Sequence, residues 1–181
     1  MPSRPGIYAW FFDAVPPLVP QEGCGRLGDW TLLYVGISPK EPPKNGARPS
    51  AQHLRKRIGT HFAGNAEGST LRRTLGILLA QETGFPLRRV GSGGRMTFTH
   101  AGEQILDAWL DQHARVCWIE DSQPWVTEEQ LIATLSLPLN LRGNEHHPFF
   151  PSLSKMRSQA LEAARQFPIA PEGGQTRKIL K

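Results

Sequence analysis

The sequence has little cysteine and no long apolar run. Its 181 residues include only two cysteines, Cys24 and Cys117, which form no metal-binding or redox motif. This excludes a disulfide framework, and we interpret both cysteines as reduced thiols of an intracellular protein. No stretch reaches the roughly 20 apolar residues of a membrane-spanning helix, and the N-terminus lacks an apolar signal segment. We therefore expect a soluble, cytoplasmic protein that does not bind membranes.

Acidic residues are scarce in one part of the chain, where basic residues gather. The formal net charge is +5, and residues 55–95 hold eight lysines and arginines against two acidic residues. The rest of the chain is close to neutral, so the basic block is local. Such a block is typical of a surface that faces a polyanion such as nucleic acid. His146 and His147 have no cysteine or acidic partner at zinc-ligand spacing, which argues against a zinc site.

Two apolar, aromatic runs near the N-terminus predict β-strands. Residues 6–12 and 30–37 are rich in aromatic and β-branched side chains, and the segment between them contains the glycines and prolines of a loop. Strands joined in this way most simply pair as an antiparallel hairpin. The pairing would bring Tyr8 and Tyr34 towards a common face. Each tyrosine belongs to a tripeptide with a glycine, where another group can approach the backbone closely.

A helix is expected after Ser50, which can act as its N-cap. Its buried stripe would consist of residues spaced four apart, namely Leu54, Ile58 and Phe62. Arg57 and His61 are also four residues apart, on a strip beside that stripe. We therefore expect these two side chains to be neighbours at the edge of the core.

The remaining pattern alternates helices with short strands. Helices are expected after Ser69 or Thr70, over 102–113, after Thr127 and over 153–166, and a strand over 115–119. Glycines at 91–94 predict a turn between short strands. Trp118 and Trp125 are interpreted as core residues. The segment from about Pro168 onward is rich in glycine, proline and basic residues, which predicts disorder.

Several short motifs occur in a fixed order along the chain. The tripeptides Gly6-Ile7-Tyr8 and Tyr34-Val35-Gly36 come first, and Leu54-x-x-Arg57-Ile58 follows. Glu128-x-x-Leu131-Ile132 comes next and selects Glu128 instead of Glu129, and Pro138-x-Asn140 ends the series. This ordered set, over roughly residues 5–141, resembles the GIY-YIG nuclease superfamily. His61, one helical turn after Arg57, is similar to the histidine of the restriction-endonuclease branch.

The resemblance implies both a fold and a set of functional residues. The fold would be mixed α/β, with a small central, largely antiparallel three-stranded sheet flanked by helices. The implied catalytic residues are Tyr8, Tyr34, Arg57, His61, Glu128 and Asn140, with Glu128 as the metal ligand. We expect a nuclease domain over 1–150, a C-terminal helix packed on it over 151–167, and a disordered basic tail over 168–181.

The implied roles agree with the chemistry of phosphodiester hydrolysis. A single carboxylate at Glu128, with waters and a substrate phosphate oxygen, suits Mg²⁺ or Mn²⁺. Arg57 can form a bidentate contact with the phosphate as its negative charge grows. A tyrosine has a pKa near 10, and lowering it to ~7 needs about 4 kcal/mol, which one cation ~4 Å away can supply. Tyr8 could therefore be the general base, with Tyr34 supporting it.

His61 could take the proton instead, because its ordinary pKa is near ~6.5. The sequence leaves the choice between Tyr8 and His61 open. Asn140 would position the phosphate or the catalytic helix.

Substrate contacts are expected from Lys56, Arg72 and Arg73. The two arginines lie in the first turn of a predicted helix, where a bound anion would offset their conflict with the helix dipole. The predicted function is a metal-dependent endonuclease that hydrolyses DNA, with RNA left open as a substrate. The alternative is an inactive nucleic-acid-binding module. A restriction-like role would need a homodimer to cut both strands.

Overall fold

The computed structural model describes residues 1–48 and 50–171, and in it the chain divides into two compact units. The first unit contains residues 1–15, 19–59 and 113–150, and the second contains 16–18, 60–112 and the chain from 151 onward. The predicted domain boundaries at 150 and 167 stay a prediction. Most of the predicted disordered tail, from 172 onward, lies outside the described residues. Within the described residues, no helix is long and apolar enough to span a membrane.

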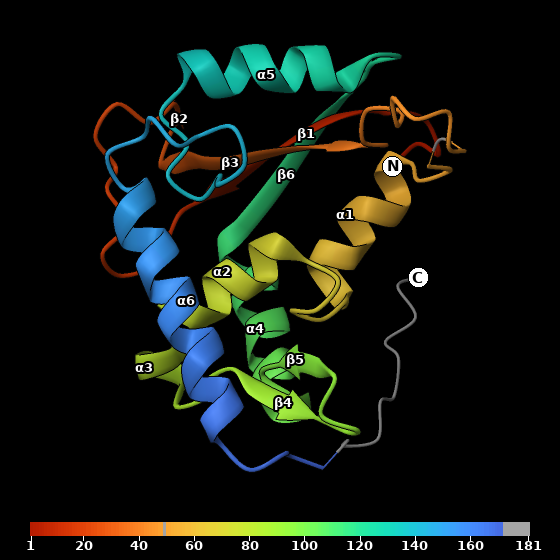
Figure 1. Cartoon of the computed structure of the whole chain (residues 1–181). Helices are drawn as coiled ribbons and strands as arrows, with labels where there is room; N and C mark the ends of the chain where they lie inside the picture. The colour runs from red at the N-terminus through yellow and green to blue at the C-terminus, as the bar shows by residue number, and fades with distance from the viewer. Residues whose placement is uncertain (49, 172–181) are drawn as a thin grey trace. The chain divides into compact units, whose positions relative to one another are not determined.

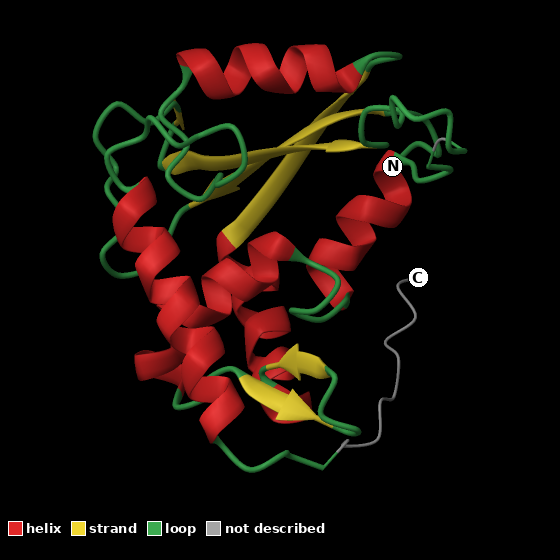
Figure 2. Ribbon diagram, viewed as in Figure 1, coloured by secondary structure: helices red, strands yellow, loops and turns green. Residues whose placement is uncertain are grey.

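The first unit is built on a twisted antiparallel sheet (Figures 1 and 2). Its strands lie in the order β2-β3-β1-β6, with bounds Arg26–Leu27, Trp30–Ser38, Gly6–Phe12 and Ala114–Glu120. The structure confirms the mixed α/β fold and the three main strands. The expected count of three strands is wrong by one. A tight turn at Gly28, whose φ is 59°, folds the two-residue β2 back onto the start of β3.

The helix α5 (Pro124–Thr134) covers one face of this sheet. Apolar residues of β1, β3, α5 and the segment just after α5 form the core there, namely Ala9, Phe11, Leu32, Val35, Leu131, Ile132, Leu135 and Leu137. The expectation that this helix begins after Thr127, with Thr127 as its N-cap, is wrong, because Pro124 begins the helix and Gln123 precedes it as the cap. Thr127 instead lies inside the helix and donates its hydroxyl to Asp121.

The helix α1 (Leu54–Ala63) begins beside Gly6 in the first unit. A side chain at Gly6 would overlap the carbonyl oxygen of Ile119 and lie 2.7 Å from Cδ1 of Leu54. Glycine is therefore needed where β1, β6 and the start of α1 approach one another. The close packing fixes the helix that carries Arg57.

The second unit contains mostly helices and one short hairpin (Figure 2). Its elements are α2 (Thr70–Leu78), α3 (Ala80–Thr83), β4 (Arg88–Val90), β5 (Arg95–Thr97), α4 (Thr99–His113) and α6 (Phe150–Gln166). The predicted helices and the turn at 91–94 are confirmed. Ser69 caps α2, because its hydroxyl oxygen accepts a hydrogen bond from the backbone N–H of Arg72 at 3.1 Å.

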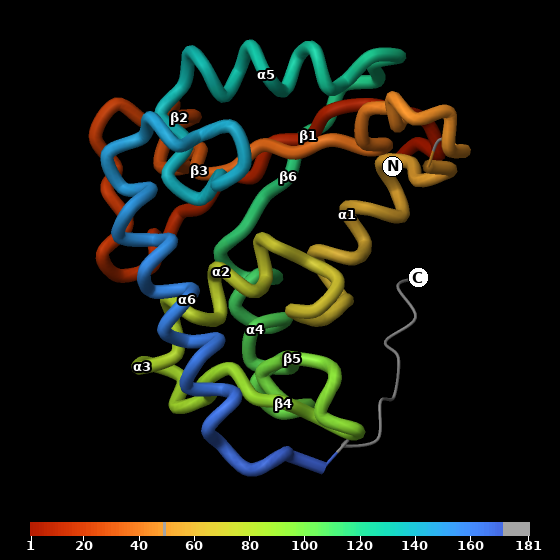
Figure 3. Tube along the Cα trace, viewed as in Figure 1, coloured from red at the N-terminus to blue at the C-terminus, as the bar shows by residue number. Residues whose placement is uncertain are grey.

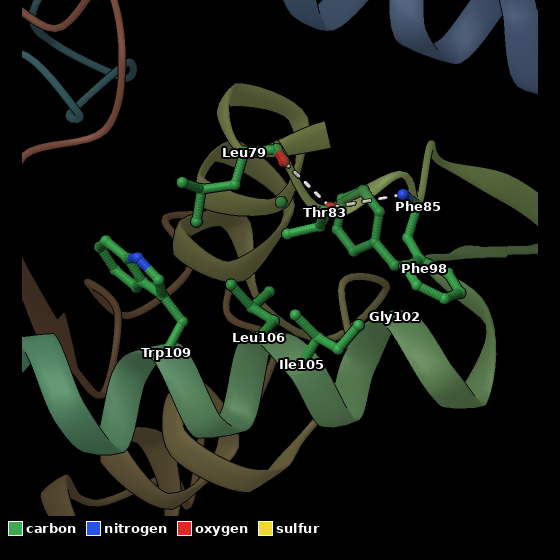
Figure 4. Close-up of a pocket in the computed structure, with 9 residues that line it drawn as sticks. Leu79, Thr83, Phe85, Phe98, Gly102, Ile105, Leu106 and Trp109 are labelled. Carbon is green, nitrogen blue, oxygen red and sulfur yellow. Dashed lines mark hydrogen bonds between the residues drawn. The ribbon is translucent and has the colours of Figure 1, made fainter. Parts of the chain in front are cut away.

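A small apolar pocket lies in the second unit, between α4 and the α2–α3 segment (Figure 4). Its lining includes Leu79, Leu106 and Trp109, and Thr83 at its edge donates a hydrogen bond to the Leu79 carbonyl at 3.0 Å. The pocket has no polar lining surface, so we interpret it as a packing gap of the core. A side chain at Gly102 would lie 2.8 Å from Cβ of Phe98, which is why this wall needs glycine.

Candidate active site

The two tyrosines lie on the same face of the sheet. In the pairing of β1 with β3, Tyr8 lies opposite Gly36 and Trp10 lies opposite Tyr34. Tyr8 and Trp10 share a face because they are two residues apart, and directly opposed residues of paired strands also share a face. The expected convergence of Tyr8 and Tyr34 on one face is therefore confirmed. It is the face opposite the one that packs against α5.

The ring of Tyr8 leans across the backbone of Gly36. A Cβ atom at Gly36 would lie 2.6 Å from the Tyr8 hydroxyl oxygen and 2.7 Å from Cζ. Any larger residue at position 36 would displace this ring. Gly36 is therefore needed to place the phenol of Tyr8. The hydroxyl group is thereby carried from β1 over to β3.

Tyr8 is fully buried, and burial raises the pKa of its phenol well above 10. The neighbouring Tyr34 adds to this increase, and Glu128 adds a smaller part. Arg57 lowers the pKa of Tyr8 through its charge and a hydrogen bond, but burial outweighs it. The expected lowering of the pKa to ~7 by one cation is therefore wrong for the protein alone, because that argument omitted desolvation.

Glu128, on α5, interacts electrostatically with Tyr8 and Arg57. Its side chain is half-buried, and burial raises the pKa of the carboxyl group. Three cations oppose this increase, in the order Arg142, Lys40 and Arg57. Electrostatic effects thus connect Tyr8 with Tyr34, Arg57 and Glu128, four of the six residues assigned a catalytic role from sequence, and their catalytic roles stay predictions.

Asn140 pairs with the backbone of β3 through its whole side-chain amide. Its Oδ1 accepts a hydrogen bond from the Val35 N–H at 2.9 Å, and its Nδ2 donates to the Val35 carbonyl at 2.9 Å. The backbone N–H of Leu139 also donates to the Leu33 carbonyl at 3.1 Å. These bonds hold the loop after α5 beside β3 (Figure 3). Asn140 holds the residue between Tyr34 and Gly36.

His61 lies on α1 one turn after Arg57, and its fully buried ring belongs to the second unit. Its Nδ1 is 2.6 Å from the hydroxyl oxygen of Ser69, the N-cap of α2. Because Nδ1 is engaged by Ser69, a proton-transfer role of His61 would use Nε2. That role stays a prediction.

Arg72 is completely buried and fully paired within the second unit. Its guanidinium forms ion pairs with Glu103 and Asp107, both at 2.7 Å, and donates to the carbonyls of His61 and Phe62. Every N–H group of the guanidinium is used inside the fold. This differs from the predicted substrate contact, and we assign Arg72 a structural role.

The other two predicted substrate contacts are closer to solvent. Arg73 is mostly buried, with 20% of its side chain exposed, and it pairs with Glu67 at 3.1 Å. Lys56 is exposed on α1 beside Arg57. Their contacts with nucleic acid stay predictions.

Comparison with known protein families matches the sequence of this chain to a catalytic domain. The model of the GIY-YIG catalytic domain matches residues 6–159, which is most of the chain. The chain belongs to the GIY-YIG family. Comparisons with curated proteins and with solved structures give no match. The match begins at Gly6, in the first tripeptide, and extends past Asn140. A GIY-YIG domain identifies the chain as a member of an endonuclease family, whose substrate is nucleic acid.

GIY-YIG nucleases generally use divalent metal ions. In the described part of this chain, no three or more His, Cys, Asp or Glu side chains are grouped to hold a metal ion. Glu128, the ligand expected from the sequence, stays a candidate as a lone carboxylate. A lone hard oxygen ligand fits Mg²⁺ or Mn²⁺, which keep several waters and bind substrate phosphate as well.

Sequence reasoning did not single out Lys40 and Arg142, whose charges act to lower the pKa of Glu128. Lys40 lies in a proline-rich loop and Arg142 in the loop after Asn140, and no periodic pattern marks either position. Trp118 was also misassigned, because it is 38% exposed on the edge strand β6 instead of lying in the core.

Proposed function

We propose that this GIY-YIG protein is a Mg²⁺- or Mn²⁺-dependent endonuclease that hydrolyses DNA phosphodiester bonds. The observation that carries the proposal is that the Tyr8 phenol, on the sheet face shared with Tyr34, lies against Gly36 and is hydrogen-bonded to Arg57, in a chain that matches the GIY-YIG catalytic domain. A phenol, a guanidinium and a carboxylate around one point are the groups needed to orient water, stabilise phosphate and hold a divalent ion.

Arg57 is the group that would stabilise the negative charge developing on the phosphate. It is half-buried and already hydrogen-bonded to Tyr8, so its guanidinium is held in place before substrate binds. Removing a donor of this kind typically costs about 3–4 kcal/mol of transition-state stabilisation. Since its side chain comes from a helix, its position relies little on loops.

Tyr8 would act as a neutral hydrogen-bond donor. Burial raises the pKa of its phenol, so the protonated form dominates at neutral pH. A neutral phenol can orient the attacking water or a phosphate oxygen. A divalent ion bound at Glu128 would supply Lewis acidity and lower the pKa of a coordinated water. His61 remains the sequence-predicted acceptor of the proton from that water.

A plasmid-nicking assay with two matched pairs of variants tests these roles. We expect Arg57→Gln and Glu128→Gln to slow nicking in Mg²⁺ by about 10²- to 10³-fold. Arg55→Gln and Glu129→Gln change the neighbouring exposed residues of the same type and should cut like the parent. EDTA should stop cleavage by the parent. Unchanged cleavage by both site variants would show that the assigned roles are wrong.

The same preparations discriminate the inactive binding module. Salt-dependent binding of DNA without cleavage in Mg²⁺ or Mn²⁺ would favour a module that only binds nucleic acid. A panel of single-stranded, duplex and branched DNA and of RNA, with the products mapped, would define the substrate. Analytical ultracentrifugation with and without DNA would test the predicted homodimer.

A further inference from the structure

The imidazole ring of His61 is hydrogen-bonded to the residue that caps the next helix. Within the second unit, Nδ1 of His61 lies 2.6 Å from the hydroxyl oxygen of Ser69, and both residues are fully buried. Ser69 is the N-cap of α2, and its hydroxyl oxygen also accepts the backbone N–H of Arg72 at 3.1 Å. In the part of the chain that the structure describes, these two contacts are the hydrogen bonds of the Ser69 side chain.

The two contacts together set the direction of the hydrogen bond between Ser69 and His61. A serine hydroxyl has one proton to donate and two lone pairs that can accept. The N–H of Arg72 can only donate, so Nδ1 of His61 is the acceptor that these contacts offer to the Ser69 proton. If Nδ1 carried a proton itself, the hydroxyl proton would be buried without an acceptor, which is unfavourable. Ser69 therefore donates to Nδ1, and the proton of the neutral ring lies on Nε2.

The buried Arg72 holds both partners of this hydrogen bond in place. Its guanidinium donates to the carbonyls of His61 at 3.2 Å and Phe62 at 2.9 Å, near the end of α1. Its backbone N–H fixes Ser69 at the start of α2, and its ion pairs anchor it to α4. Because one residue ties these segments together, the ring and the hydroxyl group keep their relative positions before substrate binds.

We propose that Ser69 positions His61 for cleavage by holding the neutral ring with its proton on Nε2, so that His61 serves as a hydrogen-bond donor. This inference rests on the proposed function, because it takes His61, one helical turn after Arg57, as part of the cleavage site. A ring nitrogen that carries a proton can donate a hydrogen bond but cannot accept a further proton. The role of proton acceptor through Nε2, left open by the sequence, would need the neutral ring to carry its proton on Nδ1.

Two substitutions of Ser69 separate the capping of α2 from the donation to His61. Threonine and aspartate can both cap the helix by accepting the Arg72 N–H, but only threonine keeps a proton to donate to Nδ1. We expect Ser69→Thr to cleave like the parent and Ser69→Asp to cleave about 10-fold more slowly, the loss expected for one hydrogen bond. Single-turnover nicking at saturating DNA in Mg²⁺ measures the rates, and thermal melts show whether each variant is folded.

NMR measures the position of the ring proton directly, without relying on cleavage or on a variant. Long-range proton–nitrogen correlation spectra of the isotope-labelled, metal-free protein, recorded at mildly alkaline pH where imidazole is neutral, show which ring nitrogen carries the proton. We expect a protonated Nε2 on His61 in the parent and in Ser69→Thr. In Ser69→Asp the carboxylate can only accept, so we expect the proton on Nδ1.

Two results would overturn the inference and leave the proposed function intact. One is a proton on Nδ1 of His61 in the parent, and the other is parental cleavage by a folded Ser69→Asp variant. A parent chain that cuts no nucleic acid in Mg²⁺ or Mn²⁺ would instead overturn the proposed function, and with it the part of His61 in the reaction.

Discussion

The surroundings of Arg57 and Arg72 show how differently two helical arginines from one basic segment can be used. Arg57 is half-buried beside a phenol and a carboxylate whose pKa values are both raised by burial. Arg72 is completely buried, and carboxylates and carbonyl oxygens take up its whole guanidinium. The first region keeps polar groups in unfavourable surroundings, as functional sites often do. The second satisfies its polar groups, as a structural core does.

Replacing Arg72 should give the largest effect on stability. We expect Arg72→Met to lower the free energy of unfolding by about 3–5 kcal/mol, because Glu103 would be left buried without its partner. Urea denaturation would measure this. Arg73→Met removes a more exposed pair and should cost less than about 1 kcal/mol. Equal stability of the Arg72→Met and Arg73→Met variants would contradict the deeper burial of the Arg72 ion pair.

Replacing Asn140 should affect the Arg57 region through the backbone. Asn140→Ala leaves the N–H and the carbonyl of Val35 without their partner, which should cost about 2 kcal/mol or more of stability. Cleavage should fall as well, since the same bonds hold the strand between Tyr34 and Gly36. Arg57→Gln should instead lower cleavage with little change in stability. Denaturation and nicking assays on both variants would separate these patterns, and an Asn140 variant of parental stability would contradict this account.

Because burial raises the pKa of Glu128, the free energy of unfolding of the metal-free protein should depend on pH. The folded state holds this proton more tightly than the unfolded chain, so the stability due to Glu128 is present at low pH. It is lost as pH rises from the ordinary glutamate pKa through the raised one. Glu128→Gln should therefore gain stability over the parent as pH rises through this window. Urea unfolding in EDTA between pH 4 and 7 measures the difference.

Glu129→Gln provides the control for that measurement, because Glu129 is the exposed neighbour on the same helix. If the unfolding free energies of the Glu128 and Glu129 variants differ from that of the parent by the same amount at every pH, burial of Glu128 has no energetic consequence.

The smallest effect is expected at Gly59, two residues after Arg57 on α1. A Cβ atom there would have no neighbour within 4 Å, and its backbone is helical. Gly59→Ala should therefore stabilise the protein by about 0.5–1 kcal/mol through helix propensity, leaving cleavage unchanged. Gly76→Ala in α2 should destabilise instead, because its Cβ would overlap the ring of Phe98. Thermal melts of the Gly59→Ala and Gly76→Ala variants would show whether alanine stabilises α1 and destabilises α2. A nicking assay of the Gly59 variant would show whether cleavage is unchanged.

Local patterns were sufficient to predict much of the fold. The aromatic runs at 6–12 and 30–37 form strands because their side chains suit a pleated, half-buried surface. Ser69 caps its helix as expected, because capping depends on neighbouring residues only. Thr127 was misassigned as a cap because Pro124, three residues earlier, is an equally good start. The two-residue β2 is too short to leave a periodic signal.

The sequence by itself determined the family and the residues that carry its motif, since residue types in a fixed order are visible without coordinates. Only the tertiary structure decided which arginine is satisfied in the interior and that burial raises the pKa of the Tyr8 phenol. Those properties depend on burial and on charges from distant parts of the chain. Neither burial nor the position of a distant charge can be inferred from the spacing of residues along the sequence.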